Sequence, residues 1–312
     1  MTVPVFRELL EQNHDLEIVM VSRNNFADLF QGIPNLIFKG INIDDYKGFL
    51  GMRKLANSLT KEFKPDLVAD LHDVIRTKIL NQILKQKRFS IFTIDKEKEE
   101  KAHLTDIWNL EKRQLKHNTE RYADVFRQAG FAVNLSHQFQ VGPQEKAGIG
   151  LAPFAQHKGK MLPLEKSFEV AKILSKKYKI YFFGGGKSEV DILNQWASQI
   201  SNSENVAGKF TLKQELQKIS ELEIMISMDS ANMHLASIAG TRCVSVWGST
   251  HPFAGFLGYG QSEADVVQVK DLSCRPCSVF GDLPCYRGDW ACLEELQVQQ
   301  IIDKILPLKI TN

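Results

Sequence analysis

The sequence lacks any long apolar segment, because no run comes near the roughly 18 consecutive apolar residues that a membrane-spanning helix needs. Residues 1–17, MTVPVFRELLEQNHDLE, mix charged with apolar side chains and do not resemble a secretory signal. Net charge is also scarce, +2 over 312 residues, which implies no general affinity for nucleic acid. Internal repeats and low-complexity segments are absent. These absences indicate a cytoplasmic globular protein, long enough for one large or two ordinary domains.

Strand-like runs alternate with helical ones almost throughout the chain. Several of the strand-like runs are apolar on consecutive residues, which is typical of strands covered on both faces. They lie at 16–23, 65–72, 88–95, 147–154, 178–185, 222–229 and 243–248. Amphipathic helical patterns, such as those at 164–177 and 188–200, separate them. This alternation predicts parallel sheets with crossover helices.

A polar joint that contains Gly and Pro, VGPQEKAGIG at 141–150, is the best domain boundary. It divides the chain into nearly equal halves, each with its own strand–helix series. We therefore predict two doubly wound, Rossmann-like α/β domains, 1–146 and 147–312, facing each other across a cleft. The first half opens with a helical pattern where such a domain normally opens with a strand. The first strand of this domain is therefore expected to be missing.

The last helical pattern, at 293–306, has an apolar side formed by Leu296, Ile301, Ile302 and Ile305. An apolar side of this kind must pack against other apolar residues. The last helix therefore either packs on the second domain or packs back on the first.

Polar residues gather where two strands of the second half end. Asp229 and Ser230 follow one strand and open a helix, and Gly-Ser-Thr-His-Pro at 248–252 follows the next strand. In open α/β sheets ligands bind beyond the carboxyl ends of the strands, and helix N-termini attract phosphate. Helix capping by Asp229 and Ser230 is the structural alternative. Capping alone does not account for His234 and Thr250, and the pattern favours a binding site.

Two more strand ends in the same half have a similar character. Three glycines in FFGGGKSE, 182–189, let a backbone approach a ligand closely, and Glu189 lies in the first turn of a helix, suited to a sugar hydroxyl. A tight turn also explains the glycines. In APFAQHKGKMLP, 152–163, Lys158 or Lys160 would neutralise a diphosphate, or lie solvated. Together the strand ends predict ligands for phosphate, ribose and hydroxyl groups.

The stretch DSANMHLASIAGTRCVSVWGSTHP, 229–252, resembles the signature of glycosyltransferase family 9, the ADP-heptose:lipopolysaccharide heptosyltransferases. That signature has Asp, Ser or Thr and Gly before Met-His-Leu-Ala, and a later strand that ends in Gly-x-Thr-x-Pro. Here Ala231 stands in place of the Gly. Lys160 matches the family's Lys before Trp/Leu-Pro, and Glu189 matches a Glu after the glycine-rich strand end. The resemblance covers the C-terminal half well and the N-terminal half loosely.

The resemblance implies a GT-B fold and an inverting sugar transfer that requires no catalytic metal or other cofactor. The donor would be ADP-heptose or a related nucleotide sugar, held by the second domain. Its implied contacts are Lys160, Gly185, Glu189, Asp229, Ser230, Met233, His234 and Thr250. Lys160, as a catalytic residue, and the helix N-terminus at Asp229 would stabilise the leaving diphosphate. The acceptor, a lipid-linked oligosaccharide of the lipopolysaccharide core, would meet the first domain at the inner face of the cytoplasmic membrane.

The catalytic base is where the sequence departs from the family. The family's proposed base is an Asp in a Gly-Asp loop, and this sequence begins, at MTVPVFREL, just beyond the place of that loop. Asp70 or Asp73, at the end of another strand, is a candidate substitute base, although a loop with a helix cap also explains both. The alternative function is a non-catalytic nucleotide- or glycan-binding relative that has lost its base. A nucleotide-sugar epimerase of the same fold is a weaker third hypothesis.

A basic stripe lies in the first half. Between residues 74 and 94 there are five basic residues, among them Arg76, Lys85 and Lys87, and no acidic one. Such a stripe attracts a phosphorylated lipid-linked acceptor or an anionic membrane surface, or it is only a solvated helix face.

Four of the five cysteines lie close together, in a C-x2-C-x7-C-x6-C pattern formed by Cys274, Cys277, Cys285 and Cys292. The fifth, Cys243, lies in a strand pattern and is expected in the core. Reduced packing thiols, a disulfide or a structural metal each explain the cluster. No His lies nearby as an additional ligand.

Overall fold

The computed structural model describes residues 1–139 and 145–305, which form two compact α/β units. The first unit comprises residues 1–96 and 118–136, and the second comprises residues 97–117 and the chain from 137 onward. The division predicted at 146/147 differs at two places, because residues 97–117 and the chain from residue 137 to residue 146 belong to the second unit. Part of the predicted joint, residues 140–144, lies outside the described residues.

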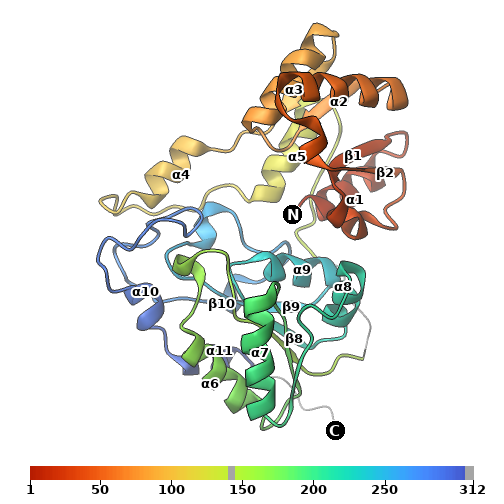
Figure 1. Cartoon of the computed structure of the whole chain (residues 1–312). Coiled ribbons are helices and arrows are strands. Elements are labelled where there is room, and N and C mark those ends of the chain that lie inside the picture. Colours follow the sequence, from red (N-terminus) through yellow and green to blue (C-terminus); the bar gives the residue numbers. More distant parts are fainter. Residues whose placement is uncertain (140–144, 306–312) are drawn as a thin grey trace. The chain divides into compact units, whose positions relative to one another are not determined.

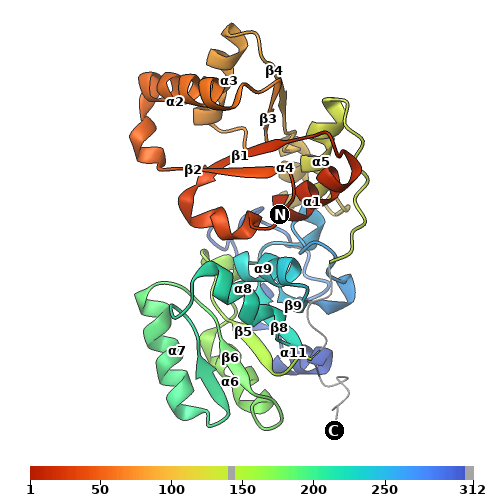
Figure 2. The same cartoon turned by 90° about the vertical axis from the view of Figure 1, so that its right-hand side faces the viewer.

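The first unit contains two separate pairs of parallel strands (Figure 2). Strand β1 (Ile18–Arg23) pairs with β2 (Leu36–Ile41), and β3 (Leu67–Asp70) pairs with β4 (Ser90–Thr93). Within residues 1–139 no ladder joins one pair to the other. The helices are α1 (Thr2–Gln12), α2 (Gly48–Phe63), α3 (Ile75–Gln86) and α5 (Asn118–Gln128), with short 3-10 helices at Asn24–Phe30 and Ile43–Tyr46. The described chain thus enters this unit through a helix, as the sequence predicted.

Apolar faces of these helices form the core of the first unit. Phe6 of α1 is 2% exposed and meets Phe126 of α5 edge to face, with 5.9 Å between ring centroids. Leu55 of α2 and Leu84 of α3 are buried in a second cluster. Helix packing therefore joins elements that are distant in sequence.

The second unit is built on a six-stranded parallel sheet with the strand order β10-β9-β8-β5-β6-β7. The strands are β5 (Ile149–Ala152), β6 (Ile180–Phe182), β7 (Ser203–Asn205), β8 (Ile224–Met228), β9 (Arg242–Val246) and β10 (Val266–Val267). The chain winds outward from β5 to β7, and then restarts beside β5 and winds the other way from β8 to β10. The strand order reverses between β5 and β8, which is the place where open α/β sheets bind ligands.

Helices cover both faces of this sheet (Figure 1). Along β8, Ile224 and Ile226 pack into the cluster that includes α6, α7 and α11, whereas Met225 packs into the cluster that includes α8 and α9. These helices are α6 (Leu164–Leu174), α7 (Lys187–Gln199), α8 (Leu212–Ser220), α9 (Ala231–Ala239) and α11 (Val298–Ile305). The doubly wound fold predicted for this half is therefore present.

The predicted helix at 293–306 is interrupted. Helix α10 (Ala291–Glu294) ends before α11 begins, and Leu296 lies buried in the link between them. The apolar side of α11, formed by Ile301, Ile302 and Ile305, lies in the core of the second unit. Of the two predicted possibilities, the apolar side of α11 therefore packs on the second unit.

Residues 97–117 pack on the loop that follows β9. They include α4 (Lys98–Thr105). Leu104 and Leu115 share a cluster with Ala254, and the backbone N–H of Leu115 donates to the carbonyl of Phe253 at 2.8 Å. This contact explains why the segment belongs to the second unit.

A half-buried ion pair links the edge of the sheet to α11. The Arg242 guanidinium donates to both carboxylate oxygens of Asp265, at 2.8 and 2.5 Å, and to the carbonyl of Lys304 at 2.9 Å. Asp265 is only 6% exposed, so its carboxylate depends on this partner. Hydrogen bonding to Asp265 is the main cause that raises the pKa of Arg242.

Asp265→Asn should destabilise the second unit by about 1–3 kcal/mol, because an amide has only one acceptor oxygen, so one charge-assisted bond from Arg242 is lost and the other becomes weaker. All four tryptophans lie in the second unit, so urea unfolding followed by their fluorescence reports on it alone. The control is Glu221→Gln, which removes a more exposed pair with Lys218 and should cost less than about 1 kcal/mol. Equal stabilities of the two variants would contradict the role of Asp265.

Candidate active site

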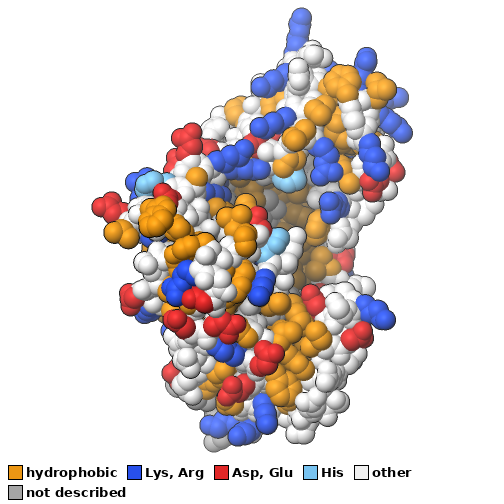
Figure 3. All heavy atoms as spheres, turned by 60° about the vertical axis from the view of Figure 1, so that its left-hand side comes forward, with side chains coloured by type: hydrophobic (Ala, Val, Ile, Leu, Met, Phe, Trp, Pro, Cys, Tyr) orange, Lys and Arg blue, Asp and Glu red, His pale blue; other side chains and the backbone are white. Residues whose placement is uncertain are grey.

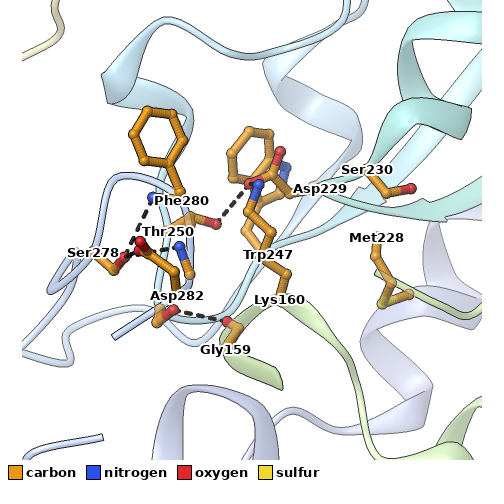
Figure 4. Close-up of polar contacts among 12 residues, drawn as sticks. Gly159, Lys160, Met228, Asp229, Ser230, Trp247, Thr250, Ser278, Phe280 and Asp282 are labelled. Carbon is orange, nitrogen blue, oxygen red and sulfur yellow. Dashed lines mark hydrogen bonds and ion pairs between the residues drawn. The ribbon is translucent and has the colours of Figure 1, made fainter. Parts of the chain in front are cut away.

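Three side chains meet at the reversal point of the second sheet (Figure 4). Lys160 follows β5 and places its Nζ 2.9 Å from Oδ2 of Asp229, which directly follows β8. The hydroxyl of Thr250, beyond the end of β9, donates to the same oxygen at 2.9 Å. Asp229 is 4% exposed and Thr250 is 1% exposed. The structure therefore brings together three of the predicted donor-site residues.

Close backbone approach holds the Lys160 loop against the end of β9. The backbone N–H and the hydroxyl of Ser249 both donate to the carbonyl of Gly159, at 2.7 and 2.9 Å. A Cβ atom on Gly159 would lie 2.3 Å from that hydroxyl oxygen, so a larger residue cannot occupy this position without a shift. The loop and the strand end are thus fixed to each other beside Lys160.

The N-terminus of α9 has no side-chain cap. Ser230 is its N-cap residue, but the hydroxyl makes no capping bond and instead lies 3.1 Å from the hydroxyl of Ser227. The carboxylate of Asp229 faces Lys160 and Thr250. The capping alternative for these two residues is therefore wrong. The first N–H groups of α9 retain their capacity to bind an anion.

The two residues that follow in this helix have different surroundings. The side chain of Met233 is fully buried in the core under α9, and the donor contact predicted for this residue stays a prediction. His234 is half-buried, and its Nδ1 atom is covered and has no hydrogen-bond partner among the described residues. Burial lowers the pKa of His234 well below its usual value, so the ring is neutral near pH 7.

His251 has a structural role. Its Nδ1 accepts a hydrogen bond from the backbone N–H of Phe253 at 3.1 Å and so caps a 3-10 helix at Pro252–Ala254. Burial, followed by the charge of Arg275, lowers the pKa of His251 to about 4. The ring is therefore neutral near pH 7 and available as an acceptor for this bond.

The glycine-rich end of β6 is open to solvent. Gly185 is exposed, and a Cβ atom there would meet nothing within 4 Å. The backbone N–H of Gly185 donates to Oε2 of Glu189 at 2.7 Å, so this carboxylate stabilises the glycine-rich turn between β6 and α7. Lys158, the alternative to Lys160, lies with its ammonium 5.3 Å from the ring centre of Trp290.

Asp70, one candidate base, is occupied by hydrogen bonds. Its Oδ1 accepts from the backbone N–H groups of His72 and Asp73, at 2.9 and 3.0 Å, and its Oδ2 accepts from the Asn81 amide at 2.7 Å. Burial by itself raises the pKa of Asp70, but these bonds together with one from Thr77 lower it overall. A carboxylate with a lowered pKa is a poor proton acceptor, and Asp70 instead shapes the turn after β3.

Asp73 is the more accessible of the two carboxylates. Its backbone has a positive φ of 43°, and its Oδ1 lies 3.4 Å from Nζ of Lys78. The side chain is 17% exposed. The carboxylate of Asp73 is therefore less engaged than that of Asp70, and the role of either residue as a base stays a prediction.

The basic residues of α3 are exposed on the first unit. Arg76 lies in the first turn of α3, Lys85 in its last turn, and Lys87 follows its last residue. Figure 3 shows Lys and Arg side chains gathered over the part of this unit that contains α2 and α3. The acceptor contact predicted for these residues stays a prediction.

Sequence reasoning missed the residues that support this site from the loop before α10. Gly281 has a φ of 73°, and a Cβ atom there would lie 2.6 Å from Cγ of Lys160. The Ser278 hydroxyl accepts from the backbone N–H of Gly281 and donates to Asp282, both at 2.8–2.9 Å (Figure 4). The tripeptide Phe-Gly-Asp at 280–282 was the signal, but a single glycine in a loop does not indicate what it approaches.

The arrangement is suited to binding an anion such as a phosphate group. A lysine ammonium retains donors beyond the one that Asp229 uses, and the uncapped N-terminus of α9 adds backbone N–H groups beside it. The sequence profile of glycosyltransferase family 9 (heptosyltransferase) matches residues 52–283, which is more than half of the chain. The chain belongs to this family.

Relatives of this glycosyltransferase family 9 chain agree with the assignment. Lipooligosaccharide heptosyltransferase 2 of Campylobacter jejuni is 26% identical over 312 aligned residues, which cover 97% of this chain and 92% of the relative. The solved structure of E. coli ADP-heptose lipopolysaccharide heptosyltransferase II is 17% identical, with a TM-score of 0.68 and coverage of 98% and 93%. The structure of the E. coli heptosyltransferase WaaC with ADP is 17% identical, with a TM-score of 0.70 and coverage of 98% and 94%. These likenesses confirm the predicted GT-B fold class.

The described part of this family 9 glycosyltransferase contains no helix that is both long and apolar enough to span a bilayer.

Asp70→Ala should destabilise the first unit by about 1–3 kcal/mol, because the buried amide of Asn81 and two part-buried backbone N–H groups lose their acceptor. Since the folded-state pKa of Asp70 is lowered, its contribution is full above the ordinary value of 3.8 and is lost as the pH falls through the folded-state value. The stability difference between the two proteins should therefore shrink in acid.

The measurement is urea unfolding followed by circular dichroism at several pH values. Asp66→Ala changes an exposed aspartate at the other end of β3 and is the control, which should leave stability and its pH dependence as they are. An Asp70→Ala protein that is as stable as its parent but inactive would restore Asp70 as a base.

Proposed function

We propose that this glycosyltransferase moves a heptose, or a related sugar, from an ADP-linked donor to a lipid-linked oligosaccharide of the lipopolysaccharide core. The donor binds the second unit, and the acceptor binds the first. The single observation that carries the donor assignment is the Lys160–Asp229 pair across the sheet reversal, next to the uncapped α9. Relatives named as heptosyltransferases, one of them solved with ADP, supply the substrate class.

In this proposal Lys160 and α9 act on the leaving group. The acceptor hydroxyl oxygen attacks the anomeric carbon of the donor sugar. The bond from that carbon to the phosphate oxygen breaks, ADP leaves, and the configuration at the anomeric carbon is inverted. Negative charge grows on the diphosphate as the bond breaks. The Lys160 ammonium and the N–H groups of α9 stabilise that charge without a metal ion. Asp229 and Thr250 act as positioning residues, because they hold the lysine in place.

The proton of the acceptor hydroxyl goes to a carboxylate of the first unit. Asp73 is the better candidate of the two, because its carboxylate is less engaged, whereas Asp70 is committed to the turn after β3. The engagement of Asp70 also favours the second candidate function, a nucleotide-binding relative that does not transfer sugar.

A transfer assay with ADP-heptose and a lipid-linked core acceptor separates the two functions. Formation of ADP together with an elongated acceptor supports the enzyme. Saturable ADP binding without any product supports the binding relative. Asp73→Asn should abolish turnover without loss of ADP affinity if Asp73 is the base.

The acceptor suggests where the protein works. A lipid-linked core oligosaccharide is held in a bilayer, and the exposed Arg76, Lys85 and Lys87 suit its phosphates or the anionic lipids around it. We therefore propose a cytoplasmic protein that associates peripherally with the inner face of the cytoplasmic membrane.

Lys160→Ala should weaken ADP binding about 10- to 100-fold, because a charge-assisted bond to phosphate is lost. Isothermal titration calorimetry measures it. Lys158→Ala is the matched control, since Lys158 lies in the same 3-10 helix but its ammonium lies over Trp290. Unchanged affinity of the Lys160 variant would remove that residue from the donor site.

Replacing Arg76, Lys85 and Lys87 together by Gln should reduce co-sedimentation with anionic vesicles that carry core glycolipid, most clearly at low salt. The control replaces three exposed lysines of the second unit, Lys172, Lys176 and Lys177, and makes the same change in net charge. Equal losses in both variants would indicate general electrostatic attraction and would sink the assignment of α3 to the acceptor side.

A further inference from the structure

A large aromatic side chain lies exposed next to the Lys160–Asp229 pair. Phe280 is 53% exposed, although burial would stabilise an apolar group of this size. The next residue, Gly281, packs on the lysine, since a Cβ atom there would lie 2.6 Å from Cγ of Lys160. In Figure 4 the ring of Phe280 and the ammonium end of Lys160 extend in the same direction, with Thr250 between them. The ring thus belongs to the surroundings of the ion pair.

Hydrogen bonds fix the backbone that carries this ring. The Ser278 hydroxyl accepts from the backbone N–H groups of Phe280 and Gly281, at 3.3 and 2.8 Å, and donates to Asp282 at 2.9 Å. The backbone N–H of Ser278 donates to the carbonyl of Ser249 at 3.4 Å. Gly281 has a φ of 73°, a conformation that favours glycine. The exposure of Phe280 is therefore imposed by an ordered turn.

The clustered cysteines of the same loop pack as thiols. Cys274, Cys277, Cys285 and Cys292 are free, and in the described residues no three His, Cys, Asp or Glu side chains are positioned to hold an ion. Burial is the main cause that raises the pKa of Cys292 to about 12, so this thiol stays protonated near pH 7. Of the three explanations predicted for the cluster, reduced packing thiols fit the structure.

A second aromatic ring supports Phe280. The ring centres of Phe256 and Phe280 lie 5.9 Å apart, and the two ring planes are tilted by 56°. Phe256 itself packs against the cluster that contains Leu104, and the ammonium of Lys101 lies 4.9 Å from its ring centre. A ring that is already held in place loses little conformational freedom when a ligand covers it. Phe280 is thus a pre-organised apolar surface beside the candidate diphosphate site.

We propose that Phe280 forms the sugar side of the donor site, with its ring packed on the apolar face of the pyranose that the diphosphate carries. This inference rests on the proposed function, in which Lys160 and the start of α9 hold the diphosphate. The sugar is bonded directly to that diphosphate, so a surface next to Lys160 is placed to meet it.

The chemistry of a pyranose suits an aromatic ring. Its C–H groups lie on the faces of the sugar, whereas most of its hydroxyls point outward around the rim. A flat apolar ring therefore covers one face of the sugar and leaves these hydroxyls free for hydrogen bonds. Because Phe280 contacts the sugar and not the nucleotide, it favours the loaded donor over ADP, the product that must leave.

The test is calorimetric titration of the 312-residue protein with ADP-heptose and with ADP. Phe280→Ala should bind ADP-heptose at least about 5-fold more weakly than the parent protein, and should bind ADP as the parent does. Phe280→Tyr keeps the ring and should retain the parent's affinity for ADP-heptose. Phe280→Leu keeps apolar bulk without a flat face and should be weakened. Leu283→Ala is the matched control, because Leu283 is 54% exposed in the same loop, and it should change neither affinity.

The two ligands separate the inference from the proposed function. Unchanged ADP-heptose affinity in Phe280→Ala overturns the inference alone, and a raised KM for the lipid-linked acceptor in that variant would assign the ring to the acceptor sugar. Equal losses for ADP and ADP-heptose would show that Phe280 only supports the Lys160 loop, and would also overturn it. A parent protein that does not bind ADP-heptose refutes the proposed function and this inference with it.

Discussion

A carboxylate that is almost excluded from water determines how the second unit is organised at its functional edge. Asp229 is 4% exposed, and such a charge is tolerated only where a cation and hydrogen-bond donors meet it. Lys160 comes to it from the loop after β5, and Thr250 comes from the end of β9. Because β5 and β8 are the two strands where the sheet order reverses, this one contact joins both windings of the sheet. The Gly159–Ser249 contact and the cysteine-rich loop then follow as supports of the lysine.

Much of this arrangement was predictable from the sequence, because buried parallel strands leave continuous apolar runs. The polar residues that end those runs, such as Lys160, Asp229 and Thr250, necessarily share one edge of the sheet. Strands with weaker patterns were missed. In β2, Leu36–Ile41, the apolar run is broken by Lys39 and Gly40, and β10 has only the two residues Val266 and Val267. The helix predicted at 293–306 has a break after Glu294 that its apolar spacing does not reveal.

The roles of individual side chains were less predictable, because they depend on neighbours that are distant in sequence. Asp70 is a carboxylate at the end of a strand, where a base is expected, yet its carboxylate already accepts hydrogen bonds from three donors. Met233 lies in the family signature, but it faces the core. Conversely, Ser230 resembles a helix cap and does not act as one, which leaves the N-terminus of α9 for a ligand. Arg275 gave no signal in the sequence, since nothing there shows that its guanidinium is buried among carbonyl groups.

The central claim is that the Lys160–Asp229 pair and the start of α9 recognise the second phosphate of the donor nucleotide. Calorimetric affinities of ADP and AMP, measured side by side for the parent protein and for Lys160→Ala, test it most directly. The account predicts that the parent binds ADP at least about 10-fold more tightly than AMP, and that this preference falls to near unity in the variant. The same preference for ADP in both proteins would contradict the account and place the diphosphate elsewhere.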